Sequence, residues 1–225
     1  MPATAIGKPY KGLGMEGAVA KWYATHTKKS LEDFKTLAQR VAGQIPPKSS
    51  VLEVAPGPGY FAIELAKLGT YRVTGLDISE TFVELARANA EQENVAVDFR
   101  RGNASAMPFR DAKFDFLLCR AAFKNFTDPS GALEEMYRVL KPGGKALIID
   151  LRRDASMESI NQAVDAMSFG AVNGMITKLT FRFMLLKRAY TKKEFQELIS
   201  KTKFNGAEIR EELIGLEVML SKDRP

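Results

Sequence analysis

Two carboxylates and a glycine-rich turn carry the strongest chemical signal in the sequence. Glu53 lies near the end of a hydrophobic run that leads into Ala55-Pro56-Gly57-Pro58-Gly59, and Asp77 ends the next hydrophobic run. A strand, a glycine-rich turn, a helix and an acid at the tip of the following strand are typical of nucleotide-binding α/β proteins. Such an acid can accept hydrogen bonds from both ribose hydroxyls. The sequence therefore predicts a cofactor with a nucleoside part.

The residues of the turn distinguish between classes of cofactor. In the dinucleotide fingerprint, a third glycine lets the helix pack closely while a pyrophosphate sits on its N-terminus. Here the helix opens with Tyr60-Phe61, the third glycine is missing, and Glu53 would repel a phosphate. S-adenosylmethionine carries an ammonium and a sulfonium and no phosphate. These residues therefore favour S-adenosylmethionine, and a nicotinamide-dependent oxidoreductase is the less favoured alternative.

Strands and helices alternate along the region that holds these residues. Hydrophobic runs predict strands at about 50–55, 72–77, 95–100, 114–119 and 145–150, with helices at about 60–68, 79–92 and 129–140. Strands that alternate with helices form right-handed crossovers and a parallel sheet. An earlier helix is expected after Ser30, and Thr191 opens a capping box before the last helix. Two closing strands are expected at about 207–213 and 216–221.

Five sequence blocks in order resemble the class I S-adenosylmethionine-dependent methyltransferases, and most closely the branch that acts on small molecules and quinones. The blocks lie at residues 51–59, 75–79, 102–109, 114–116 and 138–144. The resemblance covers about residues 50–150 and extends to the last helix and strand pair. It implies the Rossmann-like fold of this family: a seven-stranded, mostly parallel sheet with an antiparallel last strand and helices on both faces.

The resemblance also implies which residues bind S-adenosylmethionine. Glu53 would contact the methionine amino group, Asp77 the ribose, and Ile78 the adenine ring. The backbone of the turn at 55–59 would line the methionine part of the cofactor. The edge of its adenine ring would contact Asn103 and Ala104, after the third strand. The implied cofactor-binding set is Glu53, Ala55, Gly57, Pro58, Gly59, Asp77, Ile78, Asn103, Ala104 and Cys119.

Two positions in this set depart from the family pattern. Ala55 stands where the family has its first glycine, which is compatible with the fold if the φ angle of Ala55 is negative. Asn103 replaces the commoner aspartate, and its amide oxygen could still accept a hydrogen bond from the adenine amino group. Cofactor binding is expected to survive both changes.

The residues that would assist methyl transfer are less clear from the sequence. Relatives often carry a pair of histidines after the fourth strand, whereas this chain has Lys124 and Asn125 there. Three residues are candidates for a catalytic role: His26, the only imidazole, Tyr23, three residues earlier on the same helical face of the N-terminal arm, and Lys124. Lys124 could act as a base only if burial lowered its pKa by several units, so a solvated lysine is the favoured interpretation.

Length and composition predict one domain of 225 residues. Its expected parts are an N-terminal arm and helix (1–48), the cofactor-binding core (49–150), a helical lid insertion (151–190), and the last helix with closing strands (191–225). The insertion is rich in Met and Phe, which suits an apolar substrate pocket. Without a metal-ligand cluster, a signal peptide or an apolar run of roughly 18 to 20 residues, we expect a cytoplasmic protein without a metal.

The net charge of +6 would suit an anionic partner, but the basic residues are spread along the whole chain. A nucleic-acid partner is therefore not favoured, and a transient contact with an acidic membrane surface remains an alternative. The expected function is methyl transfer from S-adenosylmethionine to a small, fairly hydrophobic acceptor, with S-adenosylhomocysteine as the product. The acceptor atom, O, N, S or C, is left open. A cofactor-binding protein without transfer activity is the alternative.

Overall fold

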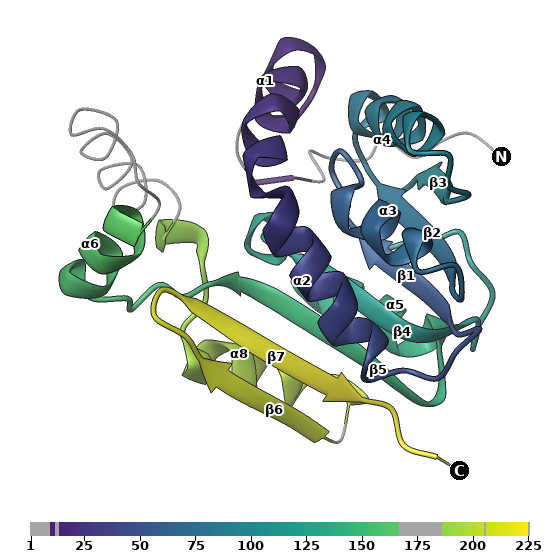
Figure 1. Cartoon of the computed structure of the whole chain (residues 1–225). Coiled ribbons are helices and arrows are strands. Elements are labelled where there is room, and N and C mark those ends of the chain that lie inside the picture. The colour runs from purple at the N-terminus through teal and green to yellow at the C-terminus, as the bar shows by residue number, and fades with distance from the viewer. Residues whose placement is uncertain (1–9, 12–13, 167–185, 205, 225) are drawn as a thin grey trace, which may run out of the picture.

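A seven-stranded sheet forms the centre of the molecule (Figure 1). The computed structural model describes residues 10–11, 14–166, 186–204 and 206–224. Within them the strand order is β3-β2-β1-β4-β5-β7-β6. The strands are β1 (Ser50–Val54), β2 (Arg72–Asp77), β3 (Asp98–Arg101), β4 (Phe114–Arg120), β5 (Leu140–Leu151), β6 (Gly206–Glu211) and β7 (Gly215–Ser221).

The first five strands are parallel, and β7 pairs antiparallel with both β5 and β6. This arrangement confirms the predicted fold class. The helical segments are α1 (Gly17–Thr27), η1 (Lys28–Ser30), α2 (Leu31–Ala42), α3 (Tyr60–Lys67), α4 (Glu80–Gln92), η2 (Phe123–Asn125), α5 (Pro129–Val139), α6 (Met157–Ala166), η4 (Leu186–Arg188) and α8 (Lys192–Ile199).

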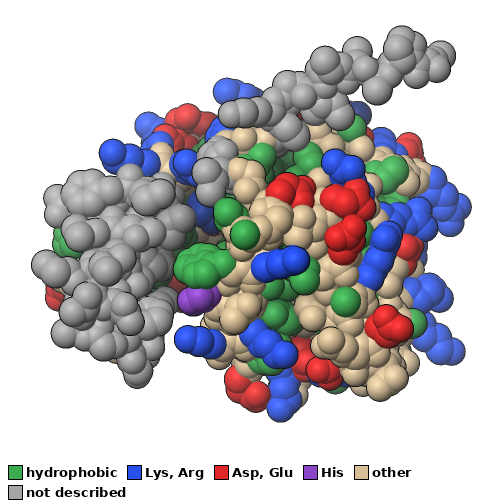
Figure 2. Space-filling view, turned by 90° about the horizontal axis from the view of Figure 1, so that it is seen from above, with side chains coloured by type: hydrophobic (Ala, Val, Ile, Leu, Met, Phe, Trp, Pro, Cys, Tyr) green, Lys and Arg blue, Asp and Glu red, His purple; other side chains and the backbone are tan. Residues whose placement is uncertain are grey.

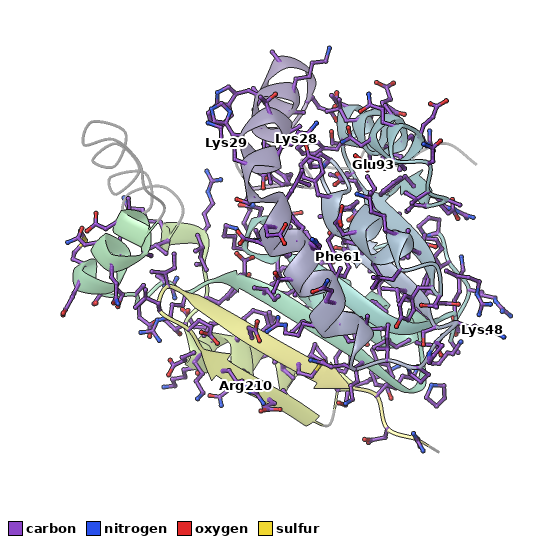
Figure 3. All side chains as sticks on the ribbon, viewed as in Figure 1. Lys28, Lys29, Lys48, Phe61, Glu93 and Arg210 are labelled. Atoms are coloured by element: carbon purple, nitrogen blue, oxygen red, sulfur yellow. The ribbon has the colours of Figure 1, made fainter. Side chains whose placement is uncertain are left out.

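Helices cover both faces of the sheet, and successive strand residues point to opposite sides. Val51 packs with the side chains of α2, α3 and α4, while Leu52 packs with those of α5 and α8. Figure 1 shows α2 and α3 in front of the sheet and α5 and α8 behind it. Phe61 points from α3 toward α2 and is fully buried between them (Figure 3). The two apolar layers fix the sheet between them.

Three predicted helix starts have the capping bonds that their sequences indicate. The Ser79 hydroxyl accepts a hydrogen bond from the Phe82 backbone N–H, and the Asp128 carboxylate accepts one from Gly131. Thr191 and Glu194 form a complete capping box at the start of α8. These bonds satisfy N–H groups that have no partner within their helix.

Other boundaries differ from the predicted ones. Ser30 makes no side-chain cap, because η1 leads directly into α2 and the chain is already helical there. β3 begins at Asp98, three residues later than expected, and β5 begins at Leu140 and includes the segment 142–144. The preceding helix, predicted at about 129–140, ends at Val139, since Leu140 already has an extended conformation.

Of the predicted lid insertion, the structure describes α6 and η4, and residues 167–185 lie outside the described residues. Ile160 and Val164 of α6 pack with Leu186 in a small third cluster of buried side chains. No helix in the described ranges is long and apolar enough to cross a membrane.

Parallel strands end at one edge of the sheet, so the loops after β1, β2, β3, β4 and β5 gather there. Lys48, just before β1, lies at the opposite end of the molecule from Lys28 and Lys29 at the end of α1 (Figure 3). Helix α1 therefore stands beside the carboxyl edge. In open α/β sheets this edge is where ligands bind.

Replacing Gly59 by alanine tests how tightly the turn after β1 is packed. Gly59 has a φ of +80°, and an added Cβ would lie 2.6 Å from Phe99 Cζ and 3.0 Å from Ala86 Cβ. We expect Gly59→Ala to lower the free energy of unfolding by about 2 to 4 kcal/mol, from backbone strain plus overpacking.

Gly69→Ala is the matched control, because Gly69 has a φ of +73° and no atom within 4 Å of an added Cβ. It should cost only about 1 kcal/mol. Urea unfolding of both variants measures the difference. Equal losses would show that the packing around Gly59 does not matter.

Candidate functional site

The turn between β1 and α3 has an unusual backbone conformation. Ala55, Gly57 and Gly59 have φ angles of +56°, +55° and +80°. The negative φ that the sequence analysis set as the condition for Ala55 is therefore not observed. The Ala55 N–H donates to the Leu76 carbonyl of β2 at 2.8 Å, and this bond helps to hold the residue in the left-handed region that usually favours glycine. The Cβ of Ala55 is thus accommodated where the family has a glycine.

Glu53 lies at the end of β1 and is 3% exposed. Its Oε2 accepts a hydrogen bond of 3.0 Å from the Ala62 backbone N–H in the first turn of α3. Burial raises the pKa of Glu53 to about 8, although the Ala62 N–H and the charge of Arg120 oppose this shift. The folded-state pKa exceeds the ordinary value of 4.5, so Glu53 destabilises the fold as the pH rises from about 4.5 to about 8.

Asp77, at the tip of β2, joins the turn to the start of α4. Its Oδ2 accepts from the Gly57 N–H and its Oδ1 from the Ser79 N–H, both at 2.9 Å. Burial raises its pKa to about 6 despite these N–H bonds. A carboxylate has about four lone-pair positions, so Asp77 can accept further hydrogen bonds. The side chain predicted to bind ribose therefore also fixes the turn.

The charges at the turn fit a cationic ligand and do not fit a phosphate. Glu53 and Asp77 are both buried, and the charge of Asp77 is one cause of the raised Glu53 pKa. A positive group placed near them would stabilise both carboxylates, whereas a pyrophosphate would add to the repulsion. The ammonium and sulfonium of S-adenosylmethionine match these requirements. This arrangement supports the cofactor inferred from the sequence.

The remaining predicted cofactor-binding residues lie on the loops of the same edge or beneath them. Pro58 is in the turn, and its carbonyl accepts from the Asn89 side chain at 2.9 Å. Ile78 follows Asp77 directly. The Asn103 amide oxygen accepts from the Ser105 N–H at 2.9 Å, which shapes the loop that carries Ala104 after β3. Adenine contacts by these residues stay predictions.

Cys119, the chain's one cysteine, is 1% exposed and belongs to the core on the α5 and α8 side of the sheet. Burial raises the pKa of its thiol well above the ordinary value. A protonated, buried thiol is a packing residue rather than a nucleophile.

Two described stretches near the N-terminus, residues 10–11 and 14–17, contact this edge and are together called the arm here. At one end, Tyr10 forms a β-bridge with Phe126, and the Lys11 N–H donates to the Asn125 carbonyl at 2.8 Å. At the other end, the Glu16 carboxylate accepts from the N–H groups of Glu80 and Thr81 at 3.1 and 3.0 Å. The arm thus connects the loop after β4 with the start of α4.

Two tyrosines are held at the edge by this N-terminal region. Tyr23, a predicted candidate, packs edge-on against Phe82 with ring centroids 5.8 Å apart, and its ring faces Gly57 of the turn. Tyr10 was not predicted. Burial raises the pKa of Tyr10, and the charges of Tyr23, Asp77 and Asp150 raise it further. An aromatic residue in an irregular glycine-rich segment gives no periodic signal, so sequence analysis missed Tyr10.

His26 lies apart from these tyrosines. Its ring is exposed, stacks on Trp22 with centroids 4.2 Å apart, and its Nδ1 contacts the Trp22 carbonyl at 2.9 Å. The Tyr23 ring instead lies against Phe82 and Gly57 of the turn, so the structure does not bring the two candidates together. A catalytic role for His26 has no support from this geometry.

Lys124 is buried, so the expectation of a solvated lysine is wrong. Its Nζ donates to Asp150 Oδ1 at 2.8 Å and to the Ala121 carbonyl at 2.7 Å. Asp150 Oδ2 also accepts from the Lys124 backbone N–H at 2.9 Å. The partner comes from β5, which pairs with β4. Lys124 and Asp150 therefore form a buried ion pair directly after β4.

Comparisons with known proteins agree with this geometry. A family model described as a methyltransferase domain matches residues 52–148. A demethylmenaquinone methyltransferase of Chlorobaculum parvum is 30% identical over 180 residues, covering 77% of this chain and 72% of that protein. One of Deinococcus radiodurans is 38% identical over 107 residues, covering 47% of this chain and 44% of that protein.

A ubiquinone/menaquinone biosynthesis C-methyltransferase of Escherichia coli is 35% identical over 124 residues, covering 53% of this chain and 49% of that protein. The chain thus spans about half the length of two of these three relatives. Among solved structures, a Methanococcus maripaludis protein described as an S-adenosyl-L-methionine-dependent methyltransferase has a TM-score of 0.79 at 20% identity, covering 97% of this chain and 99% of that one.

The plantazolicin methyltransferase BpumL, solved with S-adenosylhomocysteine, has a TM-score of 0.68 at 16% identity, covering 92% of this chain and 90% of that one. Both structural likenesses confirm the fold.

Replacing Lys124 by methionine tests the buried ion pair. The variant would leave the Asp150 charge buried without its cation, so we expect a loss of about 3 to 5 kcal/mol in the free energy of unfolding. Lys145→Met on the same sheet is the control, since Lys145 is exposed, and should change stability by less than about 0.5 kcal/mol. Chemical denaturation measures both, and a Lys124→Met variant as stable as the control would contradict the pair's importance.

Proposed function

Because this chain belongs to the S-adenosylmethionine-dependent methyltransferases of the ubiquinone/menaquinone type, we propose that it methylates a ring carbon of a hydrophobic, quinone-like acceptor. The observation that supports S-adenosylmethionine as the methyl donor is the pair of buried carboxylates, Glu53 and Asp77, at the turn after β1. The acceptor half is supported by the relatives, which are a demethylmenaquinone methyltransferase and a ubiquinone/menaquinone C-methyltransferase. A cytoplasmic location stays a prediction.

The residues of the carboxyl edge have distinct tasks toward the cofactor. Glu53 would pair with the amino group, the turn backbone would line the methionine part, and Asp77 would accept from the ribose. Tyr23 closes the side of the turn that faces α1. When bound, S-adenosylmethionine supplies an electrophilic methyl group on a good leaving group. The protein must then mainly orient the acceptor and exclude water.

The buried pair of Lys124 and Asp150 is the best candidate for orienting the acceptor. An ammonium has three N–H donors, and Lys124 uses two of them on Asp150 and the Ala121 carbonyl. The third could donate to an acceptor hydroxyl and stabilise negative charge that develops on its oxygen. Asp150 keeps Lys124 in place through two contacts, one to the ammonium and one to the backbone N–H. We therefore assign Lys124 a role in stabilising charge on the acceptor.

Two of the three candidates are poorly placed to act as a base on the acceptor, because Lys124 is paired with Asp150 and His26 is exposed beside Trp22. Burial also raises the pKa of Tyr10, whose phenol therefore stays protonated at neutral pH. A carbon acceptor activated by its own ring hydroxyls needs less help from a protein base than a catechol oxygen does. This comparison favours carbon among the four acceptor atoms that the sequence left open.

Titration of the protein with S-adenosylhomocysteine tests the cofactor site. Asp77→Ala should weaken binding by about 1 to 3 kcal/mol, since a charge-assisted ribose contact is lost. Asp98→Ala is the control, because Asp98 is an exposed carboxylate on the neighbouring β3. Calorimetry measures both affinities. Transfer of a labelled methyl group to reduced naphthoquinones then tests the reaction.

Absence of S-adenosylhomocysteine binding in the wild type would overturn the whole proposal. Binding without methyl transfer to any reduced quinone would favour a cofactor-binding protein that does not act on quinones.

Protonation of Glu53 gives a second, independent prediction. With a pKa of about 8, Glu53 is largely protonated at pH 7.5, while Asp77, with a pKa of about 6, is ionised. Pairing with the cofactor's amino group requires the carboxylate, so binding should release roughly 0.5 to 1 proton at pH 7.5 and strengthen as the pH rises toward 8.

Calorimetry of S-adenosylhomocysteine binding in buffers of different ionisation enthalpy measures this proton release. Glu53→Gln should abolish it, whereas Glu91→Gln, which changes an exposed carboxylate on α4, should not. Release that persists in Glu53→Gln would assign the proton to another group.

A further inference from the structure

Arg120, the last residue of β4, is a half-buried cation at the carboxyl edge of the sheet. Basic and acidic side chains are interspersed over the face shown in Figure 2, so surface charge alone does not mark a binding site there. Within the described ranges, the Arg120 guanidinium forms no ion pair and donates no hydrogen bond. Its N–H donors are therefore available to a ligand.

The register of the sheet places Arg120 beside the turn after β1 and on the same side of the sheet as Glu53. Glu53 is paired with Leu118 across β1 and β4, and Arg120 lies two residues beyond Leu118. Because side chains alternate between the two faces of a strand, Arg120 and Leu118 point to one side. The guanidinium carbon of Arg120 lies 4.5 Å from the ring centroid of Phe34 on α2, which covers that side.

The surroundings of Arg120 hold its side chain and backbone in place. Phe34 is buried and packs on Tyr60 with ring centroids 5.7 Å apart. The chain turns after Arg120 at Ala121, which has a φ of +57° and donates its N–H to the Ile149 carbonyl at 2.7 Å. A guanidinium that lies over an aromatic ring uses its flat face and leaves the N–H groups at its edge unoccupied. Arg120 is thus positioned without using its donors.

The order of the strands indicates which part of the cofactor would reach Arg120. Along the edge the order is β3-β2-β1-β4, and adenine and ribose are predicted to bind after β3 and β2. The methionine part would then pass the turn after β1 and end toward β4. Its amino group and its carboxylate are bonded to one carbon, so a carboxylate would lie close to Glu53 whenever Glu53 binds the amino group.

A second carboxylate beside Glu53 requires a cation, because like charges at this distance repel. The charge of Arg120 already acts on Glu53, where it opposes the rise in pKa that burial causes. Arg120 is therefore close enough to Glu53 to offset the negative charge that the cofactor would bring.

We infer that the Arg120 guanidinium binds the carboxylate of the cofactor's methionine part. The inference rests on the proposed function, because it concerns the same cofactor site. Glu53 and Arg120, from neighbouring strands, would bind the amino group and the carboxylate respectively. Two donors of the guanidinium fork can bind both carboxylate oxygens, which fixes the orientation of the methionine part as well as its position. The site would thus select a complete amino acid and discriminate against a cofactor that has only the amino group.

Calorimetric titration with S-adenosylhomocysteine and with its decarboxylated analogue tests this inference. The analogue keeps the amino group, ribose and adenine, and the wild type should bind it at least about tenfold more weakly. Arg120→Gln should weaken S-adenosylhomocysteine binding by roughly ten- to a hundredfold, as a charge-assisted contact is lost, and leave analogue binding nearly unchanged. Arg120→Lys keeps the charge without the fork and should recover part of the affinity.

Arg72→Gln is the matched control, because it removes an exposed arginine at the opposite end of β2, and it should change neither affinity. Unchanged S-adenosylhomocysteine binding by Arg120→Gln would overturn the inference. Equal losses for both ligands would also overturn it, since Arg120 would then act only through Glu53 or the fold. Wild-type protein that binds neither ligand would refute the proposed function itself, whereas analogue binding by Arg120→Gln shows that the rest of the cofactor site is intact.

Discussion

The site depends on burying two carboxylates against backbone N–H groups. A buried carboxylate is costly unless hydrogen bonds or a cation compensate it. Glu53 accepts a hydrogen bond from the N–H of Ala62, and Asp77 accepts hydrogen bonds from those of Gly57 and Ser79. These bonds fix the start of α3, the turn and the start of α4 relative to one another. The hydrogen bonds do not fully offset the cost of burying the two charges, since the pKa values of Glu53 and Asp77 stay raised. A cationic cofactor would offset the remainder.

The parallel sheet explains why residues distant in sequence meet at one place. The loops after five strands emerge at the same edge. The residues that would bind the methyl donor therefore follow β1 and β2, and those that would meet the methyl acceptor follow β4 and β5. The core on each face holds these strand ends rigidly through interdigitating apolar side chains. Lys124 and Asp150 follow the same rule, because η2, just after β4, and the neighbouring strand β5 place a cation and a carboxylate in contact. A rigid scaffold thus positions charges on otherwise irregular loops.

Local signals in the sequence were sufficient for most of the fold. Hydrophobic runs and the Thr191 capping box predicted the elements, because each depends on residues only a few positions apart. The features that escaped prediction depend on distant residues. Lys124 is buried because Asp150, 26 positions away, accepts from it. Tyr10 reaches the edge because the arm is bonded at both ends, and the φ of Ala55 follows the bond to Leu76.

The arm, which contacts Phe126 at one end and the start of α4 at the other, bears on how the cofactor is released. Its described residues contact the edge at which the cofactor would bind, and the Glu16 carboxylate accepts exposed hydrogen bonds from Glu80 and Thr81 at the N-terminus of α4. Exposed bonds of this kind are individually weak and exchange readily with water. Met15 and Gly17 add hydrogen bonds to Ser79 and Thr81 at the same helix start. Breaking this small set of bonds would free one end of the arm without unfolding the core, so release of spent cofactor is a step separate from the chemistry of methyl transfer.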